Sequence, residues 1–195
     1  FLKQCIPIGS ILYLEWLSYE LFTIQAGNLS NEELAVHVAF SNTNTTYYMV
    51  GTGLGISLTS FIGNAMGGGK KQRAQRLGII GVVLIVIFDL IFAVFLSIFR
   101  TSWADYFVSD PTTSKLMVSL LPTFILAFTA DSLQVIFSSI IRGIGKADIG
   151  MIAYFIIFYP IAQPFGYLLA FTFELGIKGI WLAMATGNTL MIICL

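Results

Sequence analysis

Residues 77–99 read LGIIGVVLIVIFDLIFAVFLSIF, and Asp89 is the only charged residue among them. As an α-helix this stretch would be about 35 Å long, which exceeds the roughly 30 Å hydrocarbon core of a bilayer. Soluble helices of this length carry a polar face, and this one has none. The stretch therefore predicts a helix that crosses a membrane.

Working outward from this stretch, the chain contains further apolar segments of similar length. Only 10% of its 195 residues are charged, and 57% are hydrophobic. Soluble domains carry about 25% charged residues, so a soluble fold could not cover its surface with so few. We predict an all-α membrane protein with six transmembrane helices. The five further segments are residues 6–26, 34–66, 116–141, 149–173 and 179–195.

Composition and motifs argue against several other classes of protein. Ten basic and ten acidic residues balance, so the chain lacks the basic surface that nucleic acid requires. Cys5 and Cys194 form neither a metal-binding spacing nor a disulfide framework. Residues 64–71, NAMGGGKK, lack the first glycine and the final Ser or Thr of a phosphate-binding loop. We expect no enzyme activity, no cofactor and no nucleic-acid partner.

The basic residues indicate which loops face the cytoplasm, because Lys and Arg concentrate on that side. Asn28-Leu29-Ser30, a glycosylation sequon, falls on the opposite, outer or lumenal, side. Both ends of the chain are then expected in the cytoplasm. One side receives Lys3, Lys70, Lys71, Arg73, Arg76, Arg142 and Lys146, and the other receives only Arg100, Lys115 and Lys178.

Acidic residues inside the apolar segments are the first candidates for a functional site. Glu15, Glu20 and Asp131 each lie where an ionised carboxylate costs about 3 kcal/mol, and such residues more often line a pathway than face lipid. Glu15 and Glu20 project about 140° apart around a helix, which suits a broad cavity. Trp16 and Tyr19 lie between them and would add ring faces for an organic cation. The alternative is that these acids only hold helices together.

Two further polar features lie within the segments. Asp131, Gln134 and Ser138 follow i, i+3, i+7 spacing, and this stripe is expected to face the bundle interior. Residues 41–46, SNTNTT, are polar on every side of a helix, so they either line a wet cavity or join helices. Nothing beside Asp89 in the sequence pairs with it, and His37 is expected to be incidental.

Specific strings resemble the C-terminal half of eukaryotic multidrug and toxic compound extrusion (MATE) transporters. They are LEWLSYE at residues 14–20, GNAMGGG at 63–69, DSLQ at 131–134 and IRGIG at 141–145. The resemblance implies helices seven to twelve, one lobe of a twelve-helix transporter whose N-terminal six-helix lobe is a separate part of a longer chain. We therefore expect residues 1–195 to be a fragment that forms one lobe.

The resemblance also implies roles for particular residues. Glu15 and Glu20 match the acids of helix seven, and Asp131 matches the acid of helix ten. Asn42 falls where some animal members carry another glutamate. Together with Gln134 of the polar stripe, these residues are the expected substrate and proton-coupling site.

The function implied is secondary antiport in the plasma membrane or in a vacuolar or other endomembrane. An organic cation or amphiphilic molecule would leave the cytoplasm as H+ or Na+ enters. Two alternatives stay open. A flippase for lipid-linked precursors would need basic residues inside its cavity, and a channel-like helical bundle could carry the same polar stripe.

Overall fold

The computed structural model describes residues 2–195, with side chains from residue 6 onward, so the side chains of Lys3 and Cys5 lie outside the described part. In this range the chain consists of helices and short connections. The all-α architecture is therefore confirmed. The helices are α1 (Leu2–Ala26), α2 (Asn31–Gly67), α3 (Lys71–Ile98), α4 (Arg100–Phe107), α5 (Pro111–Gly143), α6 (Ala147–Ile156), α7 (Gln163–Tyr167) and α8 (Ile177–Cys194), with π-helical segments η1 (Ile157–Ala162) and η2 (Leu168–Thr172).

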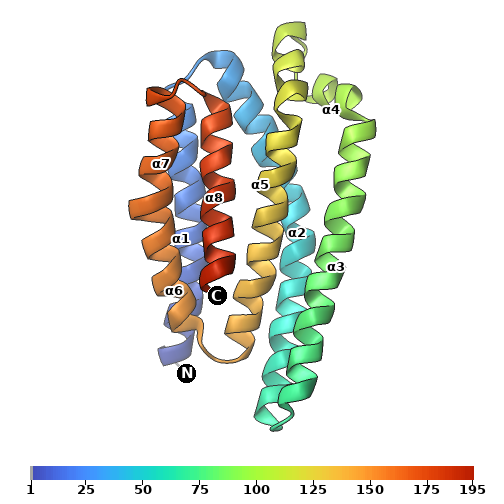
Figure 1. Cartoon of the computed structure of the whole chain (residues 1–195), viewed down its shortest axis with the longest axis vertical. Helices are drawn as coiled ribbons and strands as arrows, with labels where there is room; N and C mark the ends of the chain where they lie inside the picture. Colours follow the sequence, from blue (N-terminus) through green and yellow to red (C-terminus); the bar gives the residue numbers. More distant parts are fainter. Residues whose placement is uncertain (1) are drawn as a thin grey trace.

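Helix α5 occupies the middle of the bundle (Figure 1). On one side of it stand α1, α8 and the nearly continuous helix from α6 to η2, and on the other side stand α2 and α3. Helix α2 begins at the same end of the bundle as the ends of α1 and η2, and it crosses behind α5 to finish alongside α3. The long helices run up and down the bundle in turn, so successive connections lie at opposite ends.

Within the part of the chain that the structure describes, four helices are long and apolar enough to cross a membrane: α3, α5, the helix Ala147–Thr172 and α8. Helices α1 and α2 have sufficient length but are not among them. Glu15 and Glu20 lower the hydropathy of α1, and glycines with the polar run 41–46 lower that of α2. Length and composition therefore do not establish the expected count of six.

The short helix α4 was not expected from the sequence. Its segment is polar, and its eight residues are too few to cross a bilayer. Trp103 on α4 donates from Nε1 to Thr43 Oγ1 on α2 at 3.2 Å. Its ring stacks on Phe40 at a centroid distance of 5.7 Å and on Phe124 at 5.9 Å. Because its tryptophan enters the core, α4 packs against the ends of α2 and α5.

Glu33 caps the first turns of two helices at one end of the bundle. Ser30 and Glu33 form a reciprocal capping box at the start of α2. Glu33 Oε1 also accepts from the backbone N–H of Ile177 at 2.9 Å, in the first turn of α8. The same carboxylate therefore ties the start of α8 to the start of α2.

Helices α2 and α5 approach closely because glycines lie along their contact. A Cβ on Gly55 would collide with the Ser139 hydroxyl, and one on Gly143 would lie 2.9 Å from Ile62 Cβ. Gly55 and Gly143 therefore permit close helix approach, whereas a Cβ on Gly51 would make only ordinary contacts and one on Gly67 would meet nothing within 4 Å. Small residues thus set the spacing of the α2–α5 contact.

The helix from α6 to η2 contains two prolines, Pro160 and Pro164. Pro160 lies inside η1, where a proline removes a backbone donor. Just beyond it, Gln163 donates from Nε2 to the Ser18 carbonyl at 2.8 Å, and Gln25 donates to Gln163 Oε1 at 2.8 Å. These bonds form a polar junction between this helix and α1.

The α2–α5 contact yields a stability prediction. We expect Gly55→Ala to lower the free energy of unfolding by about 1–3 kcal/mol, because the added methyl group displaces Ser139 from the contact. Gly53→Ala on the same helix is the control, since its Cβ meets nothing within 4 Å. Thermal unfolding in detergent measures both variants. Equal stability of the two would show that α2 and α5 do not need this close approach.

Candidate functional site

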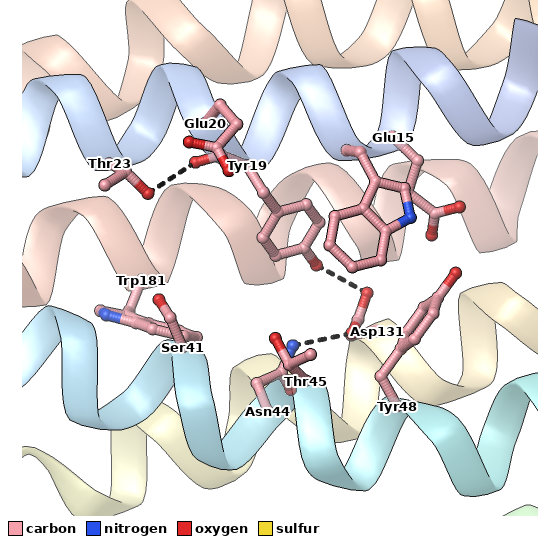
Figure 2. Close-up of a pocket in the computed structure, with 11 residues that line it drawn as sticks. Glu15, Tyr19, Glu20, Thr23, Ser41, Asn44, Thr45, Tyr48, Asp131 and Trp181 are labelled. Atoms are coloured by element: carbon pink, nitrogen blue, oxygen red, sulfur yellow. Dashed lines mark hydrogen bonds between the residues drawn. The ribbon is translucent and has the colours of Figure 1, made fainter.

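A pocket opens in the bundle between α1, α2, α5 and α8 (Figure 2). Three of its residues are acidic, and four carry large aromatic rings. None is Lys or Arg, among the residues that the structure describes. The pocket is lined by Glu15, Trp16, Tyr19, Glu20, Thr23, Ser41, Asn44, Thr45, Tyr48, Asp131 and Trp181.

Asp131, at the middle of α5, is the point on which three other helices converge. Tyr19 from α1 donates to Oδ1 at 2.6 Å, and Asn44 from α2 donates to Oδ2 at 3.1 Å (Figure 2). Asn188 from α8 donates to Oδ1 at 3.4 Å. The carboxyl is 3% exposed, and all of these partners are neutral. These donors hold the carboxyl in place but do not cancel its charge when it is ionised.

Glu15 and Glu20 both line the pocket but differ in exposure. Glu15 is buried, and its Oε1 has no hydrogen-bond partner. Glu20 is exposed and lies nearer to Thr23 than to Glu15 in Figure 2. The helix rotation between the two acids therefore sets them at different places along the same cavity. One acid is withdrawn from solvent, and the other meets it.

Aromatic rings form much of the remaining wall. Trp16 and Tyr48 meet edge to face with centroids 6.3 Å apart. Figure 2 shows Tyr48 at the same end of the pocket as Glu15. Trp181 from α8 lies at the other end, beside Ser41. Ring faces near carboxylates attract organic cations through both charge and quadrupole. This wall suits a ligand that is positively charged and partly apolar.

The polar stripe on α5 faces the bundle interior, as expected. Gln134 and Ser138 are buried, and Gln134 donates from Nε2 to Ser138 Oγ at 2.9 Å. Gln134 does not line the pocket, and its Oε1 has no partner. Of the stripe, only Asp131 reaches the cavity.

Asn42 requires a correction, because the structure does not bring it to the pocket. Its side chain is exposed, and the asparagine that binds Asp131 is Asn44. Two residues correspond to about 200° around a helix, so these two side chains leave α2 on opposite sides. Asn44 belongs to the polar run 41–46, and only the position of α5 distinguishes it from its neighbours.

His37 was expected to be incidental, yet it is buried directly beside the pocket. Its Nε2 lies 3.1 Å from Thr23 Oγ1, and its ring lies 5.7 Å from that of Trp181. Thr23 gives its own proton to the Tyr19 carbonyl at 3.0 Å, so Nε2 must be the donor in the contact with His37. Nδ1 is then an acceptor, and it has no partner. The sequence did contain one signal for His37, namely its i, i+4 spacing to Ser41 at the start of the polar run 41–46.

Helices with apolar outer faces around an acidic, aromatic pocket define an integral membrane protein with an internal acidic cavity. Comparison with known proteins places this class more narrowly. The MatE family model matches residues 7–168, so the chain belongs to the MatE family. The resemblance found in the sequence is thereby confirmed.

Relatives with curated names match almost the whole chain. Human multidrug and toxin extrusion protein 2 is 28% identical over 184 residues, which are 94% of this chain and 31% of that protein. Protein DETOXIFICATION 8 of Arabidopsis thaliana is 27% identical over 197 aligned positions, covering 100% of this chain and 41% of that protein. The chain therefore spans less than half the length of these relatives.

Solved structures share the fold. The eukaryotic MATE transporter AtDTX14 superposes with a TM-score of 0.90 at 24% identity, over 98% of this chain and 43% of that one. A MOP superfamily transporter from Pyrococcus furiosus, described for the reverse polarity of its binding pocket, superposes with a TM-score of 0.82 at 16% identity, over 98% of this chain and 42% of that one. The fold thus accommodates pockets of different character, and the residues of this pocket must decide its chemistry.

The two asparagines of α2 provide a matched test of the site. We expect Asn44→Leu to lower the free energy of unfolding by about 1–3 kcal/mol, because it removes a donor from the buried Asp131 carboxyl. Asn42→Leu makes the same chemical change on an exposed position of the same helix, and it should leave stability unchanged. Thermal unfolding of both variants in detergent measures the difference. A larger loss of stability for Asn42→Leu than for Asn44→Leu would show that Asn44 is not the asparagine that binds Asp131.

Proposed function

We propose that this chain is part of a secondary transporter that exports organic cations or amphiphilic small molecules in exchange for protons or sodium ions. The observation that carries the proposal is the pocket, which combines Glu15, Glu20 and Asp131 with aromatic walls and lacks a basic lining residue in the described part of the chain. Such a lining attracts cations and repels anions. The extrusion proteins among the relatives are consistent with it.

The proposal includes the organisation of the whole protein. We take the chain as a six-helix lobe, corresponding to helices seven to twelve, with a second lobe elsewhere in a longer protein. Helices α1 and α2 would cross the membrane in addition to the four apolar helices, since they run 25 and 37 residues. Their polar faces would be tolerated because they line the pocket rather than meet lipid. A second lobe would complete the pocket on the side where Trp16 and Glu20 are exposed.

Coupling follows from competition for the same carboxyl groups. A cation and a proton cannot both neutralise Asp131, so binding of either one releases the other. Tyr19 and Asn44 remain hydrogen-bonded to the carboxyl and keep it in position for both occupants. Glu20, which is exposed, would meet the incoming ligand first. Rocking of two lobes about the pocket would then present it to each side of the membrane in turn.

The lining of the pocket also helps to choose between antiport and the two alternatives, a flippase and a channel-like bundle. A flippase for lipid-linked precursors needs cationic groups for phosphate, and the basic residues of this chain lie outside the pocket. A channel-like bundle would share the polar interior. It would differ in passing ions electrogenically, without dependence on a proton gradient. We therefore favour antiport, with flux driven by a pH gradient as the discriminating measurement.

Location and orientation are also proposals. We place the protein in the plasma membrane or in a vacuolar or other endomembrane. The connection between α2 and α3, which carries Lys70 and is followed by Lys71 at the start of α3, would face the cytoplasm, as would both ends of the chain. The connection between α1 and α2, which carries Asn28, would face outside or the lumen.

The coupling proposal is tested by neutralising the acids in the full-length protein. We expect Asp131→Asn and Glu20→Gln each to abolish organic-cation flux, because an amide keeps the size of the acid but cannot exchange a proton for a cation. Uptake of a fluorescent cation by proteoliposomes under an imposed pH gradient measures this. Glu32→Gln, an exposed acid outside the pocket, should retain wild-type flux. Wild-type flux in both acid variants would remove these residues from the mechanism.

Orientation is tested with single cysteines in a protein whose own cysteines are replaced by serine. In sealed vesicles with the cytoplasmic side inward, we expect an impermeant thiol reagent to label Leu29→Cys but not Lys71→Cys. The reason is the excess of Lys and Arg at the end of the bundle that contains Lys71. The opposite labelling pattern would mean that the topology is inverted.

A further inference from the structure

A second buried carboxyl group lies away from the pocket, on α3. The neighbours of Asp89 on this helix are apolar and exposed, including Phe88 at 45% and Leu90 at 60%, whereas Asp89 is only 3% exposed. It occupies the narrow face of α3 that packs on α2 and α5, together with Ile85. An apolar side chain would ordinarily fill such a position, so the acid needs an explanation.

The partners of Asp89 are hydroxyl groups. Tyr47 from α2 donates to Oδ1 at 2.7 Å. Ser132 from α5 places its Oγ 2.8 Å from Oδ1 and 2.8 Å from Oδ2. The titratable groups that face Asp89 are Tyr47 from α2 and Asp131 from α5, and neither is a cation. An ionised Asp89 would therefore be a buried negative charge without a positive counterpart.

Counting protons on Ser132 identifies the state that makes more hydrogen bonds. Its hydroxyl has one proton but lies within 3.0 Å of three acceptors, namely both Asp89 oxygens and the Thr129 carbonyl. If Asp89 carries a proton on Oδ2, it donates to Ser132, Ser132 donates to Thr129, and Tyr47 donates to Oδ1, so only the contact between Ser132 and Oδ1 has no proton. If Asp89 is ionised, the single proton of Ser132 serves either the carboxylate or the Thr129 carbonyl, and one hydrogen bond is lost.

We propose that Asp89 is a proton-binding site separate from the pocket, a neutral carboxylic acid that is hydrogen-bonded to Ser132 and Tyr47. Its ligand is a single proton held on Oδ2. The protonated acid joins three helices, α3, α2 and α5, through two hydroxyl groups. In a membrane interior, this joint avoids the energetic cost of a buried charge.

The site also positions the pocket carboxyl. Ser132 directly follows Asp131 on α5, and Tyr47 lies one helical turn beyond Asn44 on α2. The same two helices thus present Asn44 and Asp131 toward the pocket and Tyr47 and Ser132 toward Asp89. Like charges on the two carboxyls would be unfavourable, so Asp89 stays neutral while Asp131 is ionised. Asp89 is therefore a positioning residue for Asp131.

Infrared spectroscopy of the purified full-length protein tests this inference without any transport measurement, so its outcome is independent of the antiport proposal. At pH 7 we expect the difference spectrum between wild type and Asp89→Asn to show loss of a carbonyl band of a protonated carboxylic acid. The band should shift in D2O, as an exchangeable acid requires. In Ser132→Ala it should move to higher frequency, because the acid loses the group to which it donates.

Asp105→Asn is the matched control. Asp105 also binds a serine hydroxyl, with Ser114 Oγ at 2.6 Å from Oδ1, but its side chain is exposed to solvent. Its replacement should remove no band of a protonated acid. A difference spectrum for Asp89→Asn that shows only the loss of carboxylate bands would overturn the inference. A protonated-acid band that is unaffected by Ser132→Ala would overturn the assignment of Ser132 as its partner.

Discussion

The contact between α2 and α5 is the interaction on which the other features depend. Gly55 and Gly143 allow the two helices to approach within the reach of short side chains. At that separation Asn44 meets Asp131, and the hydroxyl of Thr59 reaches the Ser139 carbonyl at 3.0 Å. Larger residues along the contact would separate these groups and leave them without partners in a medium that supplies none.

Hydroxyl and amide groups bind the buried carboxyl groups of this bundle, a role that basic side chains have in many soluble proteins. Both buried aspartates are bound by neutral groups: Asp131 by Tyr19 and two asparagines, and Asp89 by Tyr47 and a serine. Neutral groups do not cancel a charge, so an ionised Asp131 would stay open to an external cation. Asp89, as the neutral acid that we propose, would carry no charge to cancel.

Much of this arrangement could be predicted from residue types and spacing. The apolar stretch 77–99 became α3, and three of the four acids in the apolar segments lie around one pocket, because carboxylates in such segments must avoid lipid. The choice of Asn44 over Asn42 could not be predicted. A run that is polar on every side has no periodicity, so only the neighbouring helix decides which side chain is buried.

Other features could not be predicted from the sequence, for different physical reasons. Asp89 has Ser132 as a partner and His37 has Trp181, and both partners lie on other helices, far away in the sequence. No local sequence pattern predicts such pairs. Helix α4 is shorter than a span, and it is held by the insertion of Trp103 into the core rather than by its own periodicity.

The π-helical turns at η1 and η2 affect how the sequence of this region can change during evolution. A π turn holds an additional residue relative to an α-helical turn, and each residue advances the helix by about 100°. Removal of one residue from Ile157–Ala162 would restore regular winding and leave Gln163 directed at Ser18 and Gln25, because the wider turn holds the additional residue that is lost. The same deletion in the α-helical part, before η1, would rotate every side chain on one side of it by about 100° relative to the other. The π turn is therefore the place in this helix where descendants of the sequence can lose a residue and keep the junction with α1.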